Sequence, residues 1–176
     1  MKEKKMKIQI NKIALLLMIV LSISACSSLE PIKEDIINKN NSYSELGYKS
    51  VSKAAKKHDV DVNFALAVAH AESRGNCNAT SYAGAKGVMQ VMPGTARKYG
   101  VRKSRSLYNC SLGADVGVRE LKYCLKISQG NKKKALTCYN AGPAWVISKK
   151  YKGRYIPKET RSYIYKILKV RINKIT

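Results

Sequence analysis

The most informative stretch of the chain is Phe64-Ala-Leu-Ala-Val-Ala-His-Ala-Glu72. It is apolar on nearly every side of a helix, which predicts a helix buried at the centre of the protein. Asp61 is a suitable N-cap, and Arg74-Gly75-Asn76 marks the end of the helix. Burial of Glu72 would disfavour its charged form and raise its pKa, so that the carboxyl group could act as a general acid. A glutamate at an exposed helix end would have the same local sequence, so this helix alone leaves both interpretations open.

The flanking sequence is helical in pattern and shows no convincing strand alternation. One amphipathic stripe comprises Val51, Ala54, Ala55 and His58. Further helices are predicted near 94–99, 112–128 and 132–140, with a turn at Gln129-Gly130-Asn131. A last helix follows Pro157, and its inward stripe would consist of Tyr163, Ile164, Ile167, Leu168 and Arg171. The pattern predicts a mostly α domain.

Length and composition favour one folded domain with a strong positive charge. The chain has 176 residues, of which 45% are hydrophobic, and this is enough for a normal core. Lys and Arg number 34 against 11 Asp and Glu, a net charge of +23. Such an imbalance predicts attraction to an anionic polymer or surface, which leaves nucleic acid, anionic lipid and cell-wall polymer as candidates.

The first 25 residues have the pattern of a signal peptide. Five lysines precede an apolar run at 13–23, which is too short for a permanent membrane span. Small residues directly before Cys26 resemble a bacterial lipobox, in which this cysteine becomes the lipidated N-terminus; ordinary cleavage beside an incidental cysteine is the alternative. Residues 26–48 are polar and are expected to form a flexible tether, followed by the folded domain at 49–176. The net charge without residues 1–25 is still about +19.

Four separated motifs carry a resemblance to a known family. In chain order they are Glu72-Ser73, Ser81-x-x-Gly84-Ala85-x-Gly87-Val88-Met89-Gln90, Tyr139-Asn140-Ala141-Gly142-Pro143 and Pro157-x-Glu159-Thr160-x-x-Tyr163. Together they resemble the lytic transglycosylase domain of the soluble lytic transglycosylase (SLT) family, within the lysozyme-like superfamily. The resemblance implies a lysozyme-like single domain with a glycan-binding cleft and no cofactor.

The resemblance also implies the chemistry and its residues. Glu72 matches the catalytic acid/base of enzymes that cleave the MurNAc–GlcNAc bond of peptidoglycan without water and leave 1,6-anhydromuramoyl ends, which makes them carbon–oxygen lyases. Substrate-binding positions carried over from the family are Ser73, Ser81, Met89, Gln90, Tyr139, Asn140 and Tyr163. Ser73 and Ser81 would orient Glu72 or cap the loop. Met89 could equally be core filler, and Tyr139 could be simple packing.

The acids of the chain favour this non-hydrolytic chemistry. A glycoside hydrolase usually needs two carboxylates at the scissile bond, whereas an internal nucleophile needs one. No motif marks a second carboxylate as a nucleophile. The family pattern Asp-Pro-x-x-Asn-Ile-x-x-Gly-x-x-Tyr-Leu is poorly kept at 109–121, where only Gly117 and Leu121 are in register.

Cysteines and histidines predict disulfides and no metal site. Cys77, Cys110, Cys124 and Cys138 allow three pairings in an exported protein. A helical hairpin would favour Cys124–Cys138 and leave Cys77–Cys110, although four free thiols are the alternative. His58 lies on an apolar helix stripe and His70 lies off the face of Glu72, so both are expected to be structural.

These features predict a lipid-anchored protein of the periplasm, on the outer membrane, that acts on peptidoglycan glycan strands. A secretion or conjugation apparatus is a further partner implied by resemblance, and no nucleic-acid motif accompanies the charge. Two alternatives remain within the cell-wall class. One is a hydrolytic muramidase, and the other is a non-catalytic peptidoglycan-binding scaffold lipoprotein.

Overall fold

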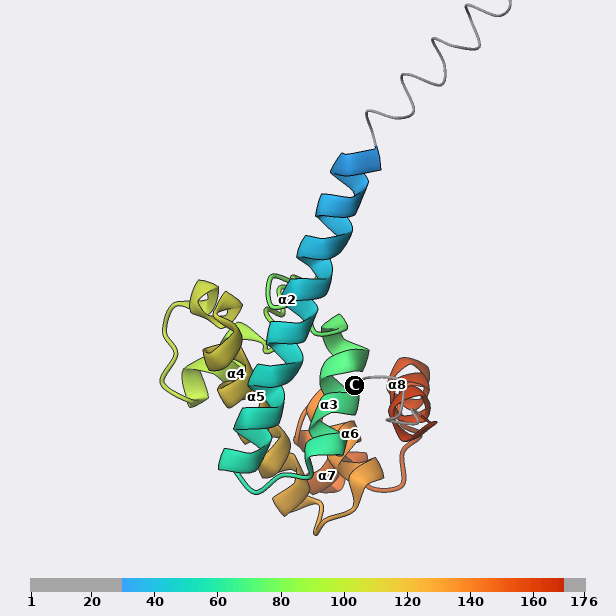
Figure 1. Ribbon diagram of the computed structural model, residues 1–176. Coiled ribbons are helices and arrows are strands. Elements are labelled where there is room, and N and C mark those ends of the chain that lie inside the picture. Colours follow the sequence, from blue (N-terminus) through green and yellow to red (C-terminus); the bar gives the residue numbers. More distant parts are fainter. Residues whose placement is uncertain (1–29, 170–176) are drawn as a thin grey trace, which may run out of the picture. The chain divides into compact units, whose positions relative to one another are not determined.

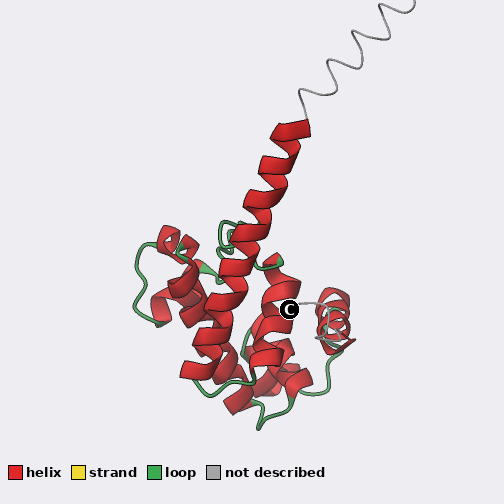
Figure 2. Ribbon diagram, in the orientation of Figure 1, coloured by secondary structure: helices red, strands yellow, loops and turns green. Residues whose placement is uncertain are grey.

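The computed structural model describes residues 30–169, and nearly every regular element in that range is a helix (Figures 1 and 2). The chain divides into two units, 1–41 and 42–176. The helices longer than one turn are α2 (Glu30–Lys57), α3 (Val62–Ser73), α4 (Pro93–Lys98), α5 (Cys110–Ile127), α6 (Lys132–Ala141) and α8 (Lys158–Lys169). Shorter turns are η1 (Ser104–Tyr108), α7 (Ala144–Ile147) and η2 (Lys149–Tyr151). The described residues hold isolated β-bridges in place of strands, as the sequence predicted.

The helix starts follow from local capping. Asp61 caps α3 by accepting a hydrogen bond from the Phe64 amide at 2.7 Å, as expected from the sequence. Asn109 and Asn131 do the same for α5 and α6. Because each of these three helices has its own capping residue, the sequence placed their starts within a few residues.

Within the segment expected to be a flexible tether, 26–48, residues 30–48 are helical and form the first part of α2. The polar run reads as a linker by composition, but its only strong helix breakers are Pro31, in the first turn, and Gly47. Polar helices lack the apolar stripe on which the sequence argument depended.

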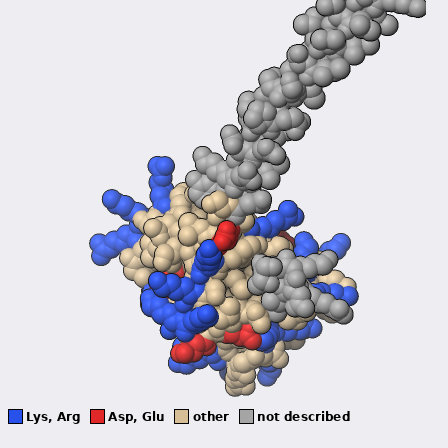
Figure 3. All heavy atoms as spheres, viewed as in Figure 1, with Lys and Arg blue, Asp and Glu red and all other residues tan. Residues whose placement is uncertain are grey.

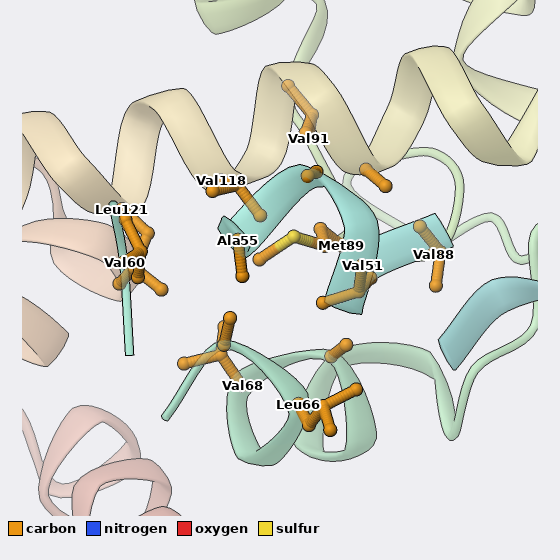
Figure 4. Close-up of a cluster of buried hydrophobic side chains, with 14 of the residues drawn as sticks. Val51, Ala55, Val60, Leu66, Val68, Val88, Met89, Val91, Val118 and Leu121 are labelled. Carbon is orange, nitrogen blue, oxygen red and sulfur yellow. The ribbon is translucent and has the colours of Figure 1, made fainter. Parts of the chain in front are cut away.

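The core of the folded unit surrounds α3. Phe64 through Ala69 are all buried, and Val51 and Ala55 of α2 and Val118 and Leu121 of α5 pack in the same cluster. Figure 4 shows Met89 among these side chains. α8 packs against α3 and α6, which places the last helix beside the end of the central one.

Two glycines permit close approaches in this core. A Cβ on Gly117 of α5 would lie 2.7 Å from Met89 Sδ and closer still to its Cβ. A Cβ on Gly47 of α2 would overlap the carbonyl oxygen of Gly75, directly after α3. Both contacts fix the segments that hold the C-terminal end of α3.

One detail of the last helix differs from the sequence prediction. Ile164 and Ile167 are buried as expected, but Leu168 is half exposed. Together with Tyr165 it lines a surface cavity that Lys133 of α6 also borders. Arg171, also expected on the inward stripe, lies outside the described residues.

Candidate active site

Glu72 lies in the last turn of α3, at the point where α8 crosses it. The hydroxyl of Tyr163 on α8 donates a hydrogen bond to Glu72 Oε1 at 2.6 Å. Burial raises the pKa of Glu72 from 4.5 to about 7, and the Tyr163 hydrogen bond opposes that rise by stabilising the carboxylate. Near neutral pH this carboxyl group therefore exists in both protonation states, so it can donate a proton and take one back.

Two tyrosine hydroxyls are held as permanent donors around this carboxyl group. Burial raises the pKa of Tyr163 well above its usual value, and the charge of Glu72 raises it further. Tyr139 of α6 shows the same direction for the same two causes. Its hydroxyl donates to the Met89 carbonyl oxygen at 2.8 Å. Tyr139 thus fixes the backbone of the loop that precedes α4.

The two serines of the motifs hold this loop rather than Glu72. Ser73 Oγ donates to the Val88 carbonyl oxygen at 2.8 Å and thereby joins the end of α3 to the loop. Ser81 Oγ accepts from the Ala85 amide at 3.0 Å. Of the two roles expected for them, loop capping is the one these bonds perform.

Gln90 has a left-handed backbone, with φ of 47°. Its Nε2 donates to the carbonyl oxygens of Ala79 at 3.1 Å and Gly87 at 2.9 Å. Both amide hydrogens are therefore used within the loop, and the side-chain carbonyl oxygen is the group that Gln90 keeps for other partners.

The placement of Met89 in the cleft is wrong for its side chain, which is completely buried. It occupies the space left by Gly117, so it fills the core. The contact between Met89 and Gly117 could not be predicted from the sequence, because the two residues belong to distant segments of the chain.

A cavity of about 160 Å³ lies beside these residues. Its polar lining includes Gln90, Tyr139, Asn140 and Glu120. Asn140 is exposed, and its Oδ1 accepts a hydrogen bond from Thr160 Oγ1 at 2.8 Å, which fixes the amide and leaves its nitrogen free to donate to another group. This hydrogen bond connects α6 to α8, the helix that carries Tyr163.

Glu120 is the site residue that sequence reasoning missed. It stands where the family pattern has tyrosine, it is 9% exposed, and it lines the cavity. Its Oε2 accepts from Tyr99 Oη at 2.6 Å and Lys98 Nζ at 2.9 Å. The available signal was an acid on the buried stripe of α5, between Gly117 and Leu121.

The other acidic side chains of residues 42–169 have partners away from Glu72 or lie at the surface. Asp115 binds Lys57 and His58, and the pKa of its carboxyl group is lowered by hydrogen bonds from both, against the effect of burial. The remaining contacts are Glu45 with Lys49, Asp59 with Lys122 and Asp61 with Lys132, while Glu159 is exposed in the first turn of α8.

Both histidines have protein partners. His58 Nε2 lies 2.8 Å from Asp115 Oδ1, and His70 Nδ1 lies 2.7 Å from Tyr48 Oη. Within the described part of the chain, His, Cys, Asp and Glu form no cluster of three or more that could hold a metal ion.

Two disulfides are present, Cys77–Cys110 and Cys124–Cys138, which are the pairs that the helical-hairpin argument favoured. The first joins the segment after α3 to the start of α5, and the second joins α5 to α6. The signal-peptide and lipidation predictions at 1–25 and Cys26 lie outside the described residues. Among the residues that the structure describes, no helix is both long and apolar enough to span a bilayer.

The helical domain, with a tyrosine hydrogen-bonded to the glutamic acid at the end of its central helix, belongs by its fold to the lysozyme-like class. The chain belongs to the Transglycosylase SLT domain family, whose model matches residues 49–161. The soluble lytic murein transglycosylase of Salmonella typhimurium is 33% identical over 95 residues, covering 50% of this chain and 15% of that protein.

Two solved structures share the fold. One is an inactive glutamate-to-glutamine mutant of the lytic transglycosylase Slt from Pseudomonas aeruginosa, and the other is the 70 kDa soluble lytic transglycosylase from Escherichia coli. Each has a TM-score of 0.59 and 26% identity, and each match covers 68% of this chain and 22% of the other. The chain therefore corresponds to a minor part of these larger relatives.

Proposed function

We propose that the protein is a peptidoglycan lytic transglycosylase that cleaves the β-1,4 bond between N-acetylmuramic acid and N-acetylglucosamine, with Glu72 as general acid and then base. The observation that carries the proposal is the position of Glu72 at the end of the central helix, where its Oε1 accepts a hydrogen bond of 2.6 Å from Tyr163 and burial raises its pKa to about 7. Membership of the SLT family and the inactive glutamate mutant of the Pseudomonas relative support it.

The reaction requires one acid group used twice. Protonated Glu72 donates its proton to the glycosidic oxygen as the bond from C1 to that oxygen breaks. The resulting carboxylate then accepts the proton of the muramic C6 hydroxyl as its oxygen bonds to C1. The product is a 1,6-anhydromuramoyl end, no water is consumed, and Glu72 returns to its protonated form.

The surroundings of Glu72 suit this sequence. Tyr163 donates to Oε1 and so stabilises the carboxylate that exists between the two proton transfers. Glu120, the other acid that lines the cavity, is held by Lys98 and Tyr99, and this favours the internal hydroxyl over a carboxylate nucleophile. The Gln90 carbonyl and the Asn140 amide nitrogen, both beside the cavity, are suited to bind sugar hydroxyl and acetamido groups.

The proposed location follows from the N-terminal sequence and the charge. Residues 1–25 would direct export, and lipidated Cys26 would anchor the protein to the periplasmic side of the outer membrane. Lys and Arg side chains cover much of the face in Figure 3, with few acids between them. This charge would favour the anionic cell envelope. A role in a secretion or conjugation apparatus is tested in a strain that lacks this protein. Intact secretion and conjugation in that strain would exclude the role.

The activity is tested by incubating purified peptidoglycan with wild-type protein, Glu72→Gln and the control Glu45→Gln, which changes a surface acid paired with Lys49. Wild type and the control should release soluble muropeptides, and Glu72→Gln should be slower by about 10²-fold or more while remaining folded by circular dichroism. Unchanged release by Glu72→Gln would contradict the assignment. Folded wild-type protein that pellets with the wall without cutting it would instead be a scaffold.

A further inference from the structure

A second pocket, separate from the Glu72 site, is lined by basic and aromatic side chains. Its volume is about 470 Å³, and it lies between the start of α6, α7 and the segment up to residue 156. We define the basic pocket by Lys134, Trp145, Lys149, Tyr151, Lys152 and Arg154. None of these residues was assigned a role by the sequence motifs.

The aromatic part of the basic pocket is preformed. The Trp145 and Tyr151 rings stack with centroids 4.4 Å apart and an angle of 27° between their planes. Both residues are only partly buried, so they keep accessible surface. Stacked rings that remain accessible offer a flat apolar surface for an aliphatic chain or an amide plane.

The charged part is uncompensated by neighbouring acids. No Asp or Glu occurs in the sequence from 121 to 158. Lys134, Lys149, Lys152 and Arg154 are all exposed, and no ion pair within the described residues engages them. Four cations around an accessible aromatic wall favour a ligand that carries several anionic groups together with apolar or amide surface.

We propose that the basic pocket binds the peptide stems of peptidoglycan through their carboxylates. This inference rests on the proposed function, because the stems belong to the polymer that the proposed reaction cleaves. A stem combines carboxylates with amide planes and aliphatic side chains, and it therefore matches both parts of the lining. The apolar residues Val146, Ile147 and Ile156, which also line the pocket, favour such a ligand over a bare phosphate.

The position of the pocket suits a stem attached to a bound glycan. Neighbouring residues of α6 line the two cavities, Thr137 the basic pocket and Cys138 the cavity beside Gln90. Pro143 lines the latter cavity, and α7 with Trp145 follows it directly. The two cavities thus share α6 and the turn from Pro143 to Trp145 as walls.

Trp145 is the only tryptophan of the chain, so intrinsic tryptophan fluorescence reports on this pocket alone. The experiment titrates the full protein carrying Glu72→Gln with a free stem tetrapeptide that bears the γ-D-Glu and diaminopimelate carboxylates. We expect a saturable fluorescence change that weakens as salt is added. The same peptide with its carboxylates amidated should give no saturable change.

The variant test removes two exposed cations with Lys152→Ala/Arg154→Ala. The affinity of this double variant for the peptide should fall about tenfold or more, because at least one charge-assisted hydrogen bond is lost. The control Arg102→Ala/Lys103→Ala removes the same charge from another exposed segment and should bind as before. Equal binding by both double variants, or an equal response to amidated peptide, would overturn the proposal. So would tighter binding of a single-stranded oligonucleotide, which would define a general polyanion site.

This titration is independent of catalysis, so the two proposals fail separately. Cleavage of peptidoglycan without peptide binding would reject the stem pocket and leave the transglycosylase intact. Peptide binding without cleavage would reject the transglycosylase alone. In an active protein, a second readout compares intact peptidoglycan with glycan stripped of stems by an amidase. Wild type should prefer the intact polymer, and the pocket variant should lose that preference.

Discussion

Replacing Tyr163 by phenylalanine tests how the active site sets the protonation of Glu72. The change removes one hydroxyl, whose hydrogen bond to Oε1 is 2.6 Å long, and keeps the ring that packs between α3 and α8. That hydrogen bond favours the ionised carboxyl group and so holds the pKa of Glu72 below the value that burial alone would give. Without it, the pKa of Glu72 should rise.

The size of the change follows from the strength of such a bond. A hydrogen bond to a charged group contributes about 1.5–3 kcal/mol, and the neutral carboxyl group would retain part of it. A difference of about 1.4 kcal/mol between the two forms corresponds to roughly one pH unit. Activity that requires protonated Glu72 falls as pH rises through its pKa of about 7 in the wild type. In Tyr163→Phe this alkaline limb should move upward by roughly one pH unit.

The assay measures muropeptide release from purified peptidoglycan between pH 5 and 9, for wild type, Tyr163→Phe and Tyr165→Phe. Tyr165 lies on the same helix, with 59% of its surface exposed, and serves as the matched control. Carbon-13 NMR of labelled glutamate carboxyl groups, with the Glu72 signal assigned from Glu72→Gln, follows the same titration directly. An alkaline limb that stays in place or moves to lower pH in Tyr163→Phe would refute the reasoning.

Three further variants test the energetics of the fold. The pKa of Glu72 is raised on folding from 4.5 to about 7, so the folded state binds this proton more tightly than the unfolded state does. The proton therefore contributes roughly 3 kcal/mol to the free energy of unfolding, which is fully present below pH 4.5 and is lost as pH rises through 7. Glu72→Gln should therefore stabilise the protein relative to wild type more at pH 8 than at pH 4.5 in thermal unfolding, and an equal effect at both pH values would disprove this. Gly117→Ala should destabilise by about 1–3 kcal/mol through overpacking. Gly94→Ala should not, because its new Cβ would meet only the Arg97 side chain, at 4.0 Å, and denaturant unfolding of the two variants decides. Replacing Cys124 and Cys138 by alanine opens a disulfide that joins residues 14 apart and should lower the free energy of unfolding by about 3 kcal/mol, and an unchanged denaturation midpoint would count against it.

Much of the fold could be predicted because its signals are local. The apolar stretch from Phe64 predicted the central helix, and Asp61 predicted where it begins; the structure confirms both. The helix at residues 30–48 was not predicted, because this segment is polar and lacks the apolar periodicity that marks buried helices. Helix propensity without amphipathicity gives only a weak signal.

The site was only partly accessible from sequence. Motifs singled out Glu72 and Tyr163, 91 positions apart, and the structure joins them by a hydrogen bond. Met89 was misplaced and Glu120 was missed for one reason, since each depends on which residues α5 brings to the loop before α4. The family pattern is poorly kept in α5, and side-chain packing between distant segments leaves no periodic trace in the sequence.

The most direct test of the central claim is mass spectrometry of the products released from peptidoglycan by the wild-type protein and by Glu72→Gln. Cleavage by one glutamic acid and the muramic C6 hydroxyl predicts 1,6-anhydromuramoyl ends from wild type, about 18 Da lighter than hydrolysis products because no water is added. These products should be absent with Glu72→Gln. Reducing muramoyl ends from the wild-type protein would contradict the account and identify a hydrolytic muramidase.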